Sequence, residues 1–298
     1  MCGIVGLLVK QPQLRAQLGA LMVPMLTGMT ERGPDSAGLA VYTEPVTGQQ
    51  HKLSLYRGAH AVDWMELLVR LSAGVSGSHL ARTIGNHAVV TTDAEPEDVA
   101  AWLLAQAPEV AVLSIGRSID LYKDVGAPAE IADRYDFASL RGSHLVGHTR
   151  MATESAVTPA HAHPFTAGRD FCLVHNGSLS NPHLVRKKLE PLGIEFETDN
   201  ATEAACRFFE WRLREGDDLR TAVQRGFSEL DGFFTFLMGT DVELLIVRDA
   251  FACKPAVVAE TDDYVAIASE FRSLAHLPDI AHASLFEPKP EESYSWHI

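Results

Sequence analysis

The chain begins Met1-Cys2-Gly3-Ile4-Val5-Gly6, and the apolar residues continue through Val9. Such a run favours a buried β-strand that starts directly after the cysteine. Removal of Met1 would leave Cys2 with a free α-amine beside its thiol. An α-amine has a reference pKa of about 7.7 to 8.0, so near neutral pH it can accept the thiol proton. The stretch predicts one residue that is both nucleophile and base at the mouth of a sheet; the alternative is an ordinary thiol on a frayed terminus.

Length and charge narrow the classes of protein to which the chain can belong. Its 298 residues, 46% of them hydrophobic, can bury the core of one large domain or two modest ones. The formal net charge of −14 argues against a nucleic-acid partner, because that affinity depends on Lys and Arg. A basic signal-peptide start and an apolar run of about 18 residues are both missing from the sequence, so we expect no membrane span and a cytoplasmic protein.

Cysteine and histidine spacing does not indicate a metal. The four cysteines (Cys2, Cys172, Cys206 and Cys253) are widely separated and form no CxxC pair, which favours neither a zinc site nor a disulfide framework. The compartment is therefore expected to be reducing. Four histidines at positions 148, 161, 163 and 175 show no HxxxH spacing. We predict that this chain holds no metal.

The remaining elements follow from periodicity and turn signals. Residues 14–29 carry an apolar helical stripe with a kink expected at Pro24, and a strand is predicted at 39–42. Residues 43–117 differ in character and are predicted to be a small α/β insertion without a catalytic cluster. Its predicted strands are 52–56, 88–91 and 110–114, and its predicted helices are 62–71 and 96–106. Beyond it we predict a strand at 118–123, a helix at 128–135, and late strands at 233–238, 243–248, 256–259 and 264–269.

Two polar motifs end apolar strands. Arg150 follows a strand that begins at Leu145, and its guanidinium suits a carboxylate because it donates two parallel hydrogen bonds. A strand predicted at 171–174 leads into His175-Asn176-Gly177. The Asn176 amide and the Gly177 N–H can point two donors at one developing oxyanion, and losing one such donor typically costs about 3 kcal/mol in the barrier. His148 and His175 are expected to be scaffolding histidines.

Two further polar sites each have two interpretations. Arg32 belongs to an irregular segment, 32–38, which is either a loop held near a site or an ordinary turn. Asp199 precedes a helix, and Thr198 or Asp199 would be a natural N-cap reinforced by Glu203. The functional interpretation is that Asp199 faces the ammonium of an amino acid whose carboxylate Arg150 binds.

Together these motifs resemble a class II glutamine amidotransferase of the N-terminal nucleophile hydrolase superfamily. The resemblance rests on the segment 2–6, on 32–36, on 147–153, on 175–177 and on Thr198-Asp199, in that order along the chain. It does not include the insertion at 43–117. Met151, Glu154, Asn200 and Ala201 depart from residues common in this family, which concerns the rim of the site and coupling to a synthase more than the reacting centre.

The resemblance implies an α+β fold, a four-layer αββα sandwich spanning residues 2–298 with the insertion at 43–117. It implies that Cys2 is the nucleophile and its amine the base, with Asn176 and Gly177 binding the oxyanion. The substrate-binding residues it implies are Arg150 for the α-carboxylate, Asp199 for the α-ammonium, Arg32 for covering the site and Thr153 for polar contacts.

The resemblance also implies L-glutamine as substrate and ammonia as product. Since neither a synthase domain nor a Gly-rich phosphate loop is apparent, we expect a separate synthase subunit. The pattern is similar to stand-alone amidotransferase subunits of N-methylglutamate synthase or glutamate-synthase-like complexes, whose partner would carry FMN and iron–sulfur centres while this chain carries no cofactor. Two alternatives remain: an N-terminal nucleophile hydrolase for another linear amide, and a non-catalytic regulatory module of a synthase.

Overall fold

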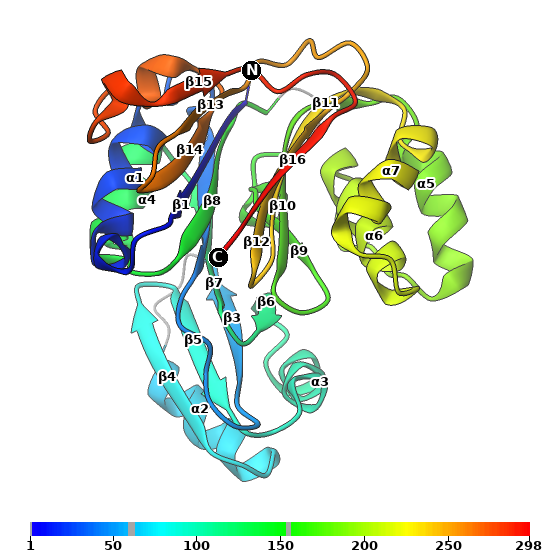
Figure 1. Ribbon diagram of the computed structural model, residues 1–298. Helices are drawn as coiled ribbons and strands as arrows, with labels where there is room; N and C mark the ends of the chain where they lie inside the picture. The colour runs from blue at the N-terminus through cyan, green and yellow to red at the C-terminus, as the bar shows by residue number, and fades with distance from the viewer. Residues whose placement is uncertain (1, 59–62, 153–155) are drawn as a thin grey trace.

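A computed structural model describes residues 2–58, 63–152 and 156–298. Two large sheets face one another, and helices cover their outer faces (Figure 1). The strands of the first sheet, in spatial order, are β15 (Ser284–Phe286), β13 (Val257–Glu260), β14 (Tyr264–Ala268), β1 (Gly3–Val9), β8 (His144–Arg150), β2 (Ser36–Tyr42) and β7 (Ile119–Val125). Every pairing in it is antiparallel.

The second sheet contains β16 (Ser293–His297), β12 (Glu243–Arg248), β11 (Gly232–Gly239), β10 (Phe171–Leu179) and β9 (Phe165–Ala167), in that spatial order. Helices α1 (Leu18–Thr27) and α4 (Pro128–Arg134) cover the first sheet, whereas α5 (Pro182–Leu189), α6 (Ala201–Arg214) and α7 (Leu219–Glu229) cover the second (Figure 1). The predicted αββα sandwich is confirmed. Short 3-10 turns lie at Pro12–Gln17, Phe137–Ser139, Pro159–His161, Glu190–Leu192, Phe271–Ser273 and Ile280–His282.

Strand β1 lies inside the first sheet and is buried on both faces. Ile4 and Leu8 enter the core between the two sheets, while Val5, Leu7 and Val9 enter the core beneath α1. This explains the unbroken apolar run, since side chains of a strand alternate between faces and here both faces are covered. The opening stretch of the sequence is thus the strand around which both cores form.

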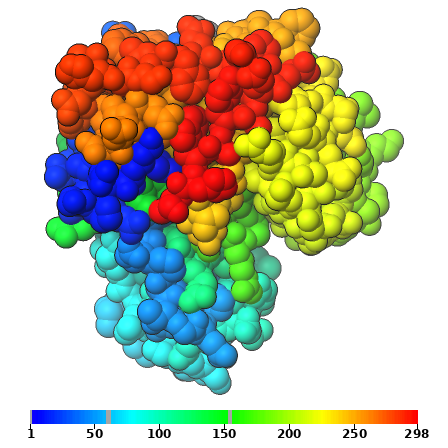
Figure 2. Space-filling view, viewed as in Figure 1, coloured from blue at the N-terminus to red at the C-terminus, as the bar shows by residue number. Residues whose placement is uncertain are grey.

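Residues 43–117 contain a third, four-stranded antiparallel sheet, ordered β4 (His79–Ile84), β5 (His87–Thr92), β3 (His51–Arg57) and β6 (Val110–Gly116). Helices α2 (Trp64–Gly74) and α3 (Pro96–Gln106) share with it a separate apolar core. The segment forms a lobe at the bottom of the view in Figure 2. Sequence reasoning missed β4, because this edge strand is mostly exposed and shows no apolar alternation.

Several predicted boundaries were wrong. The strand expected to end at Val174 continues to Leu179, because residues 176–179 keep a regular ladder with β11. Neither Thr198 nor Asp199 is the N-cap of α6; the side chain of Asn200 accepts from the N–H of Thr202 instead. The late strands belong to two sheets, since β11 and β12 join the second sheet and β13 and β14 the first. Within the described ranges, none of the helices is long and apolar enough to cross a membrane.

Leu237 tests the packing between the sheets. It is fully buried on β11, and a Cβ built on Gly6 of β1 would lie only 2.9 Å from its Cδ2, so the two strands meet here at close range. We expect Leu237→Ala to lower the free energy of unfolding by about 2 to 5 kcal/mol, because it leaves a cavity that two sheets cannot collapse to fill. Urea denaturation measures the change. The exposed Val242→Ala should shift it by under about 0.5 kcal/mol, and equal effects of the two variants would contradict this account.

Candidate active site

The strand register brings three predicted site residues to one end of the sandwich. Gly3 on β1 pairs with Thr149 on β8. Because the strands are antiparallel, Cys2, just before Gly3, and Arg150, just after Thr149, lie at the same end of the sheet. His148 on β8 reaches the facing sheet, where its Nε2 lies 3.0 Å from the carbonyl oxygen of His175 on β10. Asn176 is the next residue of that strand. Cys2, Arg150 and Asn176 therefore lie at the end of the sandwich marked by the N-terminus in Figure 1.

Cys2 is held by contacts from both sides. Its Sγ lies 3.8 Å from the carbonyl oxygen of Met151, and its own carbonyl accepts from Nε of Arg32 at 3.0 Å. Burial raises the pKa of the Cys2 thiol, while the hydrogen bond to Met151 and the guanidinium groups of Arg150 and Arg32 act in the opposite direction. A thiol with a raised pKa requires a nearby base to become a nucleophile.

The strand after Cys2 is fixed by the segment that follows β14. The N–H of Ile4 donates to Oγ of Ser269 at 3.0 Å, and the N–H of Ser269 donates to the carbonyl of Ile4 at 3.0 Å. Glu270 then pairs with Arg32 at 2.8 Å. Ser269 and Glu270 therefore have structural roles, and the segment 32–38 is held near Cys2.

Arg150 is almost fully buried at the end of β8, and its Nη1 donates to the carbonyl of Ala156 at 2.9 Å. Desolvation lowers the pKa of its guanidinium, whereas Cys2, Asp35 and Asp199 raise it. Cys2, Asp35 and Asp199 therefore all lie within electrostatic range of the Arg150 guanidinium. Asp35 was not predicted as a site residue, yet its Oδ2 accepts from the N–H of Ala152 at 2.8 Å and so shapes the chain directly after Arg150.

Asn176 offers an unused donor. Its side chain is buried, and its Nδ2 has no hydrogen-bond partner among the residues that the structure describes. A buried amide N–H without a partner costs free energy of folding, so a position retained this way is suited to a ligand oxygen. The neighbouring Gly177 has φ +151°, and a Cβ there would lie 1.9 Å from the carbonyl oxygen of Phe233. Glycine is thus required by both backbone conformation and space.

Three buried histidines lie beneath this end of the sandwich. The rings of His148 and His163 are 4.0 Å apart, and Oγ1 of Thr202 on α6 contacts both His163 Nε2 at 2.8 Å and His175 Nδ1 at 3.0 Å. Desolvation lowers the pKa of His148 and of His175 to about 3, and that of His163 well below its usual value. All three are neutral at pH 7 and act as polar spacers between the sheets, as predicted for His148 and His175.

Asp199 is exposed, and its Oδ1 contacts Nε2 of His161 at 2.8 Å. This hydrogen bond lowers the pKa of the Asp199 carboxyl. The chain before Asp199 is shaped by the buried Glu203, whose carboxylate accepts from the N–H groups of Glu197 and Thr198, both at 2.7 Å. Sequence reasoning gave Glu203 only a capping role; its position in the first turn of α6 was the available signal. Thr153 and Glu154 lie outside the described residues.

These features define a class of protein: a four-layer αββα sandwich with a cysteine at the start of an inner strand is an N-terminal nucleophile hydrolase fold, here with glutamine amidotransferase motifs around the cysteine. Comparison with known proteins identifies the family. The glutamine amidotransferase domain family matches residues 148–276. The chain is also 48% identical to the glutamine amidotransferase-like protein GlxB of Rhizobium meliloti over 99% of this chain and 98% of GlxB. The chain belongs to the class II glutamine amidotransferases.

Other relatives place the chain among both stand-alone and longer proteins. A protein of Methanothermobacter thermautotrophicus is 33% identical over 97% of each chain. The glutamine–fructose-6-phosphate aminotransferase of Vibrio parahaemolyticus is 33% identical over 42% of this chain but only 20% of its own length. Among solved structures, the phosphoribosylpyrophosphate amidotransferase of B. subtilis has a TM-score of 0.61 at 17% identity, covering 99% of this chain and 49% of that one. That likeness shows the fold, and this chain spans about half of the solved chain.

The buried histidines make stability depend on pH. Unfolding exposes these histidines and restores a pKa near 6.5. Below this pH the unfolded state therefore binds protons that the folded state does not bind. His144 behaves alike, because burial lowers its pKa to about 3. We expect the free energy of unfolding to fall between pH 7 and pH 5.5, measured by denaturant titration. His144→Gln should reduce the dependence of the free energy of unfolding on pH, and His183→Gln, at an exposed position, should not. If the free energy of unfolding of the wild type did not change between pH 7 and pH 5.5, the prediction would be wrong.

Proposed function

We propose that the protein hydrolyses L-glutamine to glutamate and ammonia through a thioester on Cys2, and that the ammonia passes to a separate synthase subunit. The observation that carries this proposal is the meeting of Cys2, Arg150 and the unpartnered Asn176 amide at one end of the sandwich. A nucleophile, a carboxylate-binding cation and an oxyanion donor are the groups that an amide of an amino acid requires.

The chemistry follows from the surroundings of the thiol. After removal of Met1, the α-amine of Cys2 takes the thiol proton, and Sγ attacks the side-chain amide carbon of glutamine. The oxyanion that forms accepts from Nδ2 of Asn176 and the N–H of Gly177. The C–N bond breaks, ammonia leaves with a proton from the α-amine, and the γ-glutamyl thioester remains. Water then attacks the thioester, releasing glutamate and restoring the thiol.

The substrate headgroup would lie between two charged side chains. Arg150 suits the α-carboxylate, because its guanidinium is buried and donates in a fixed plane. Asp199 suits the α-ammonium, because its carboxylate is exposed and its influence reaches Arg150. Arg32 would keep the Cys2 backbone in place while its segment covers the site. Thr153 is proposed to add polar contacts.

The acceptor subunit is inferred from the relatives. GlxB matches this chain over nearly all of its length, whereas the aminotransferase of V. parahaemolyticus has most of its sequence outside the match. GlxB has little sequence outside the match that could form a synthase domain, and by analogy with it we propose that another chain uses the ammonia. We propose a partner of the N-methylglutamate synthase or glutamate synthase type, which would hold FMN and iron–sulfur centres, with no cofactor in this chain.

Cys2→Ala tests the nucleophile. We expect it to abolish glutamine hydrolysis, measured as glutamate released in the presence of the partner, because both thiol attack and the thioester are lost. An electrophilic glutamine analogue, such as a diazoketone, should add one equivalent to the wild type and none to Cys2→Ala. Cys253→Ala is the matched control, since Cys253 is a free cysteine with an exposed side chain. Full hydrolysis by Cys2→Ala, or intact Met1 in the active protein, would refute the mechanism.

Asp199→Asn tests recognition of the α-ammonium. We expect KM for glutamine to rise by about tenfold or more with a smaller change in kcat, because a charge-assisted contact with the substrate ammonium is lost. Stability should not change, since the side chain is 78% exposed. Initial rates with glutamine and with a simple acyl amide that lacks the amino-acid headgroup distinguish a glutamine-specific enzyme from a hydrolase for another linear amide. Equal efficiency on both substrates in the wild type would favour a hydrolase for another linear amide.

A further inference from the structure

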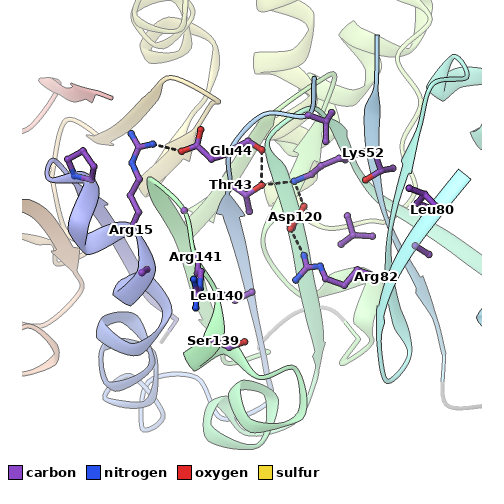
Figure 3. A pocket seen from close by; sticks show the side chains of 17 residues that line it. Arg15, Thr43, Glu44, Lys52, Leu80, Arg82, Asp120, Ser139, Leu140 and Arg141 are labelled. Carbon is purple, nitrogen blue, oxygen red and sulfur yellow. Dashed lines mark hydrogen bonds and ion pairs between the residues drawn. The ribbon is translucent and has the colours of Figure 1, made fainter. Parts of the chain in front are cut away.

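A pocket of about 790 Å³ lies between the insertion and the main body, away from Cys2 (Figure 3). The body contributes Arg15 from the turn before α1, Asp120 from β7 and Arg141 from the segment before β8. The insertion contributes Lys52 from β3 and, from β4, Arg82. A volume of this size is typical of small-molecule sites.

The pocket is positively charged in a strongly acidic protein. Its lining holds four cationic side chains, Arg15, Lys52, Arg82 and Arg141, but only two carboxylates, Glu44 and Asp120. Two positive charges are therefore unbalanced, although the chain carries a formal net charge of −14. Such local concentration of charge against the overall sign is a recognised basis for attracting an oppositely charged ligand.

The wall on the insertion side is built around one buried carboxylate. Asp120 pairs with Nζ of Lys52 at 2.5 Å and with Nη2 of Arg82 at 2.6 Å. Lys52 is itself buried and also donates to Oγ1 of Thr43 at 2.8 Å and to the carbonyl of Ser118 at 3.0 Å, so its three protons are used. Arg82 donates only through Nη2 among the described residues, and 61% of its side chain is exposed. Its other nitrogens are available to a ligand.

The opposite wall adds hydrogen-bond donors from Arg15 and Arg141. Arg15 pairs with Glu44, yet its Nε is buried and has no partner in the part of the chain that the structure describes. The guanidinium of Arg141 makes no ion pair or hydrogen bond with any described residue, and Figure 3 draws it without a dashed line, between Arg15 and Arg82. Leu80, Val46, Val89 and Leu140 supply apolar surface in the same pocket.

We propose that this pocket binds a small organic anion with two negative charges, either a phosphate monoester or a dicarboxylate. Guanidinium groups bind phosphate and carboxylate oxygens in pairs, and two unbalanced cations match a dianion. The apolar side chains would contact the organic part of the ligand. Thr43, the residue after β2, lines the pocket, whereas Ser36 at the other end of β2 pairs with Arg150. The six residue steps from Ser36 to Tyr42 span about 20 Å of strand. The ligand site is thus distinct from the glutamine site.

Calorimetric titration of the full-length Cys2→Ala variant in saturating glutamine tests the proposal, because this variant keeps the glutamine site occupied without releasing glutamate or heat of hydrolysis. The probes are adenosine 5′-monophosphate and succinate, with inorganic phosphate and uncharged adenosine for comparison. We expect saturable binding of the monoester or the dicarboxylate, whichever is the physiological chemistry, weaker binding of inorganic phosphate, and none of adenosine. Higher salt should weaken the affinity.

Variants locate the binding. Arg82→Gln and Arg141→Gln should each raise Kd by about tenfold or more, because each removes a charge-assisted contact. Both side chains are exposed, so both variants should fold, which an unchanged melting temperature would verify. Lys187→Gln, an exposed charge removal on α5, should leave Kd unchanged.

Four results would overturn the proposal. One is the absence of saturable binding by either organic anion, and another is a Kd that neither pocket variant changes. The third is inorganic phosphate binding as tightly as the organic anions, which would show an adventitious ion only. Binding of a hexaglutamate peptide with no binding of the small anions would also refute the small-ligand assignment and would indicate an acidic segment of a partner protein.

Discussion

The position of β1 inside a sheet that is covered on both faces is the constraint on which the rest of the structure depends. Its backbone is paired on both edges, with β8 and β14, and its side chains enter two separate cores. A chain terminus is ordinarily among the least ordered parts of a protein. Here the ladder with β8 begins at Gly3, so the residue before it lies directly next to paired backbone. Cys2 is therefore positioned by the packed strand that follows it, together with the contacts from Met151 and Arg32.

The same burial creates the chemical requirements of the site. Removing water from the strand ends raises the pKa of the Cys2 thiol and lowers that of the Arg150 guanidinium, because both charged forms lose hydration. Placing a latent anion near a buried cation offsets part of that cost for each. The three histidines beneath them avoid this cost by remaining neutral, and one ring nitrogen of each contacts either the His175 carbonyl or Thr202. The interior thus holds polar groups of fixed geometry without adding charge under the nucleophile.

The sequence was sufficient for features set by local pattern and insufficient for features set by partners distant in the chain. The apolar run after Cys2, the strands of the late region and the two helices of the insertion follow from periodicity, and the family motifs gave the sandwich. Pairing with β11 carries β10 through Asn176 and Gly177, residues that by themselves favour a turn. Likewise Glu203 and Asp35 shape loops through hydrogen bonds to backbone N–H groups, which residue identity does not reveal. The pocket between insertion and body was invisible, because its cations come from four separate segments.

The arrangement also explains how an insertion can be accommodated without disturbing the catalytic end. It departs after Tyr42 and returns before Ile119, and these two residues are paired neighbours on β2 and β7. Since the ladder between β2 and β7 closes the gap, the insertion adds a lobe while the sheet keeps its register. The opposite ends of the same strands adjoin Arg150, through the pairing of Ser36. A shift of the insertion relative to the body would therefore reach the Cys2 end of the sheet only through paired strands, which resist bending. Any coupling between the pocket and the Cys2 end would have to pass through the pairing of β2 with β7 and β8.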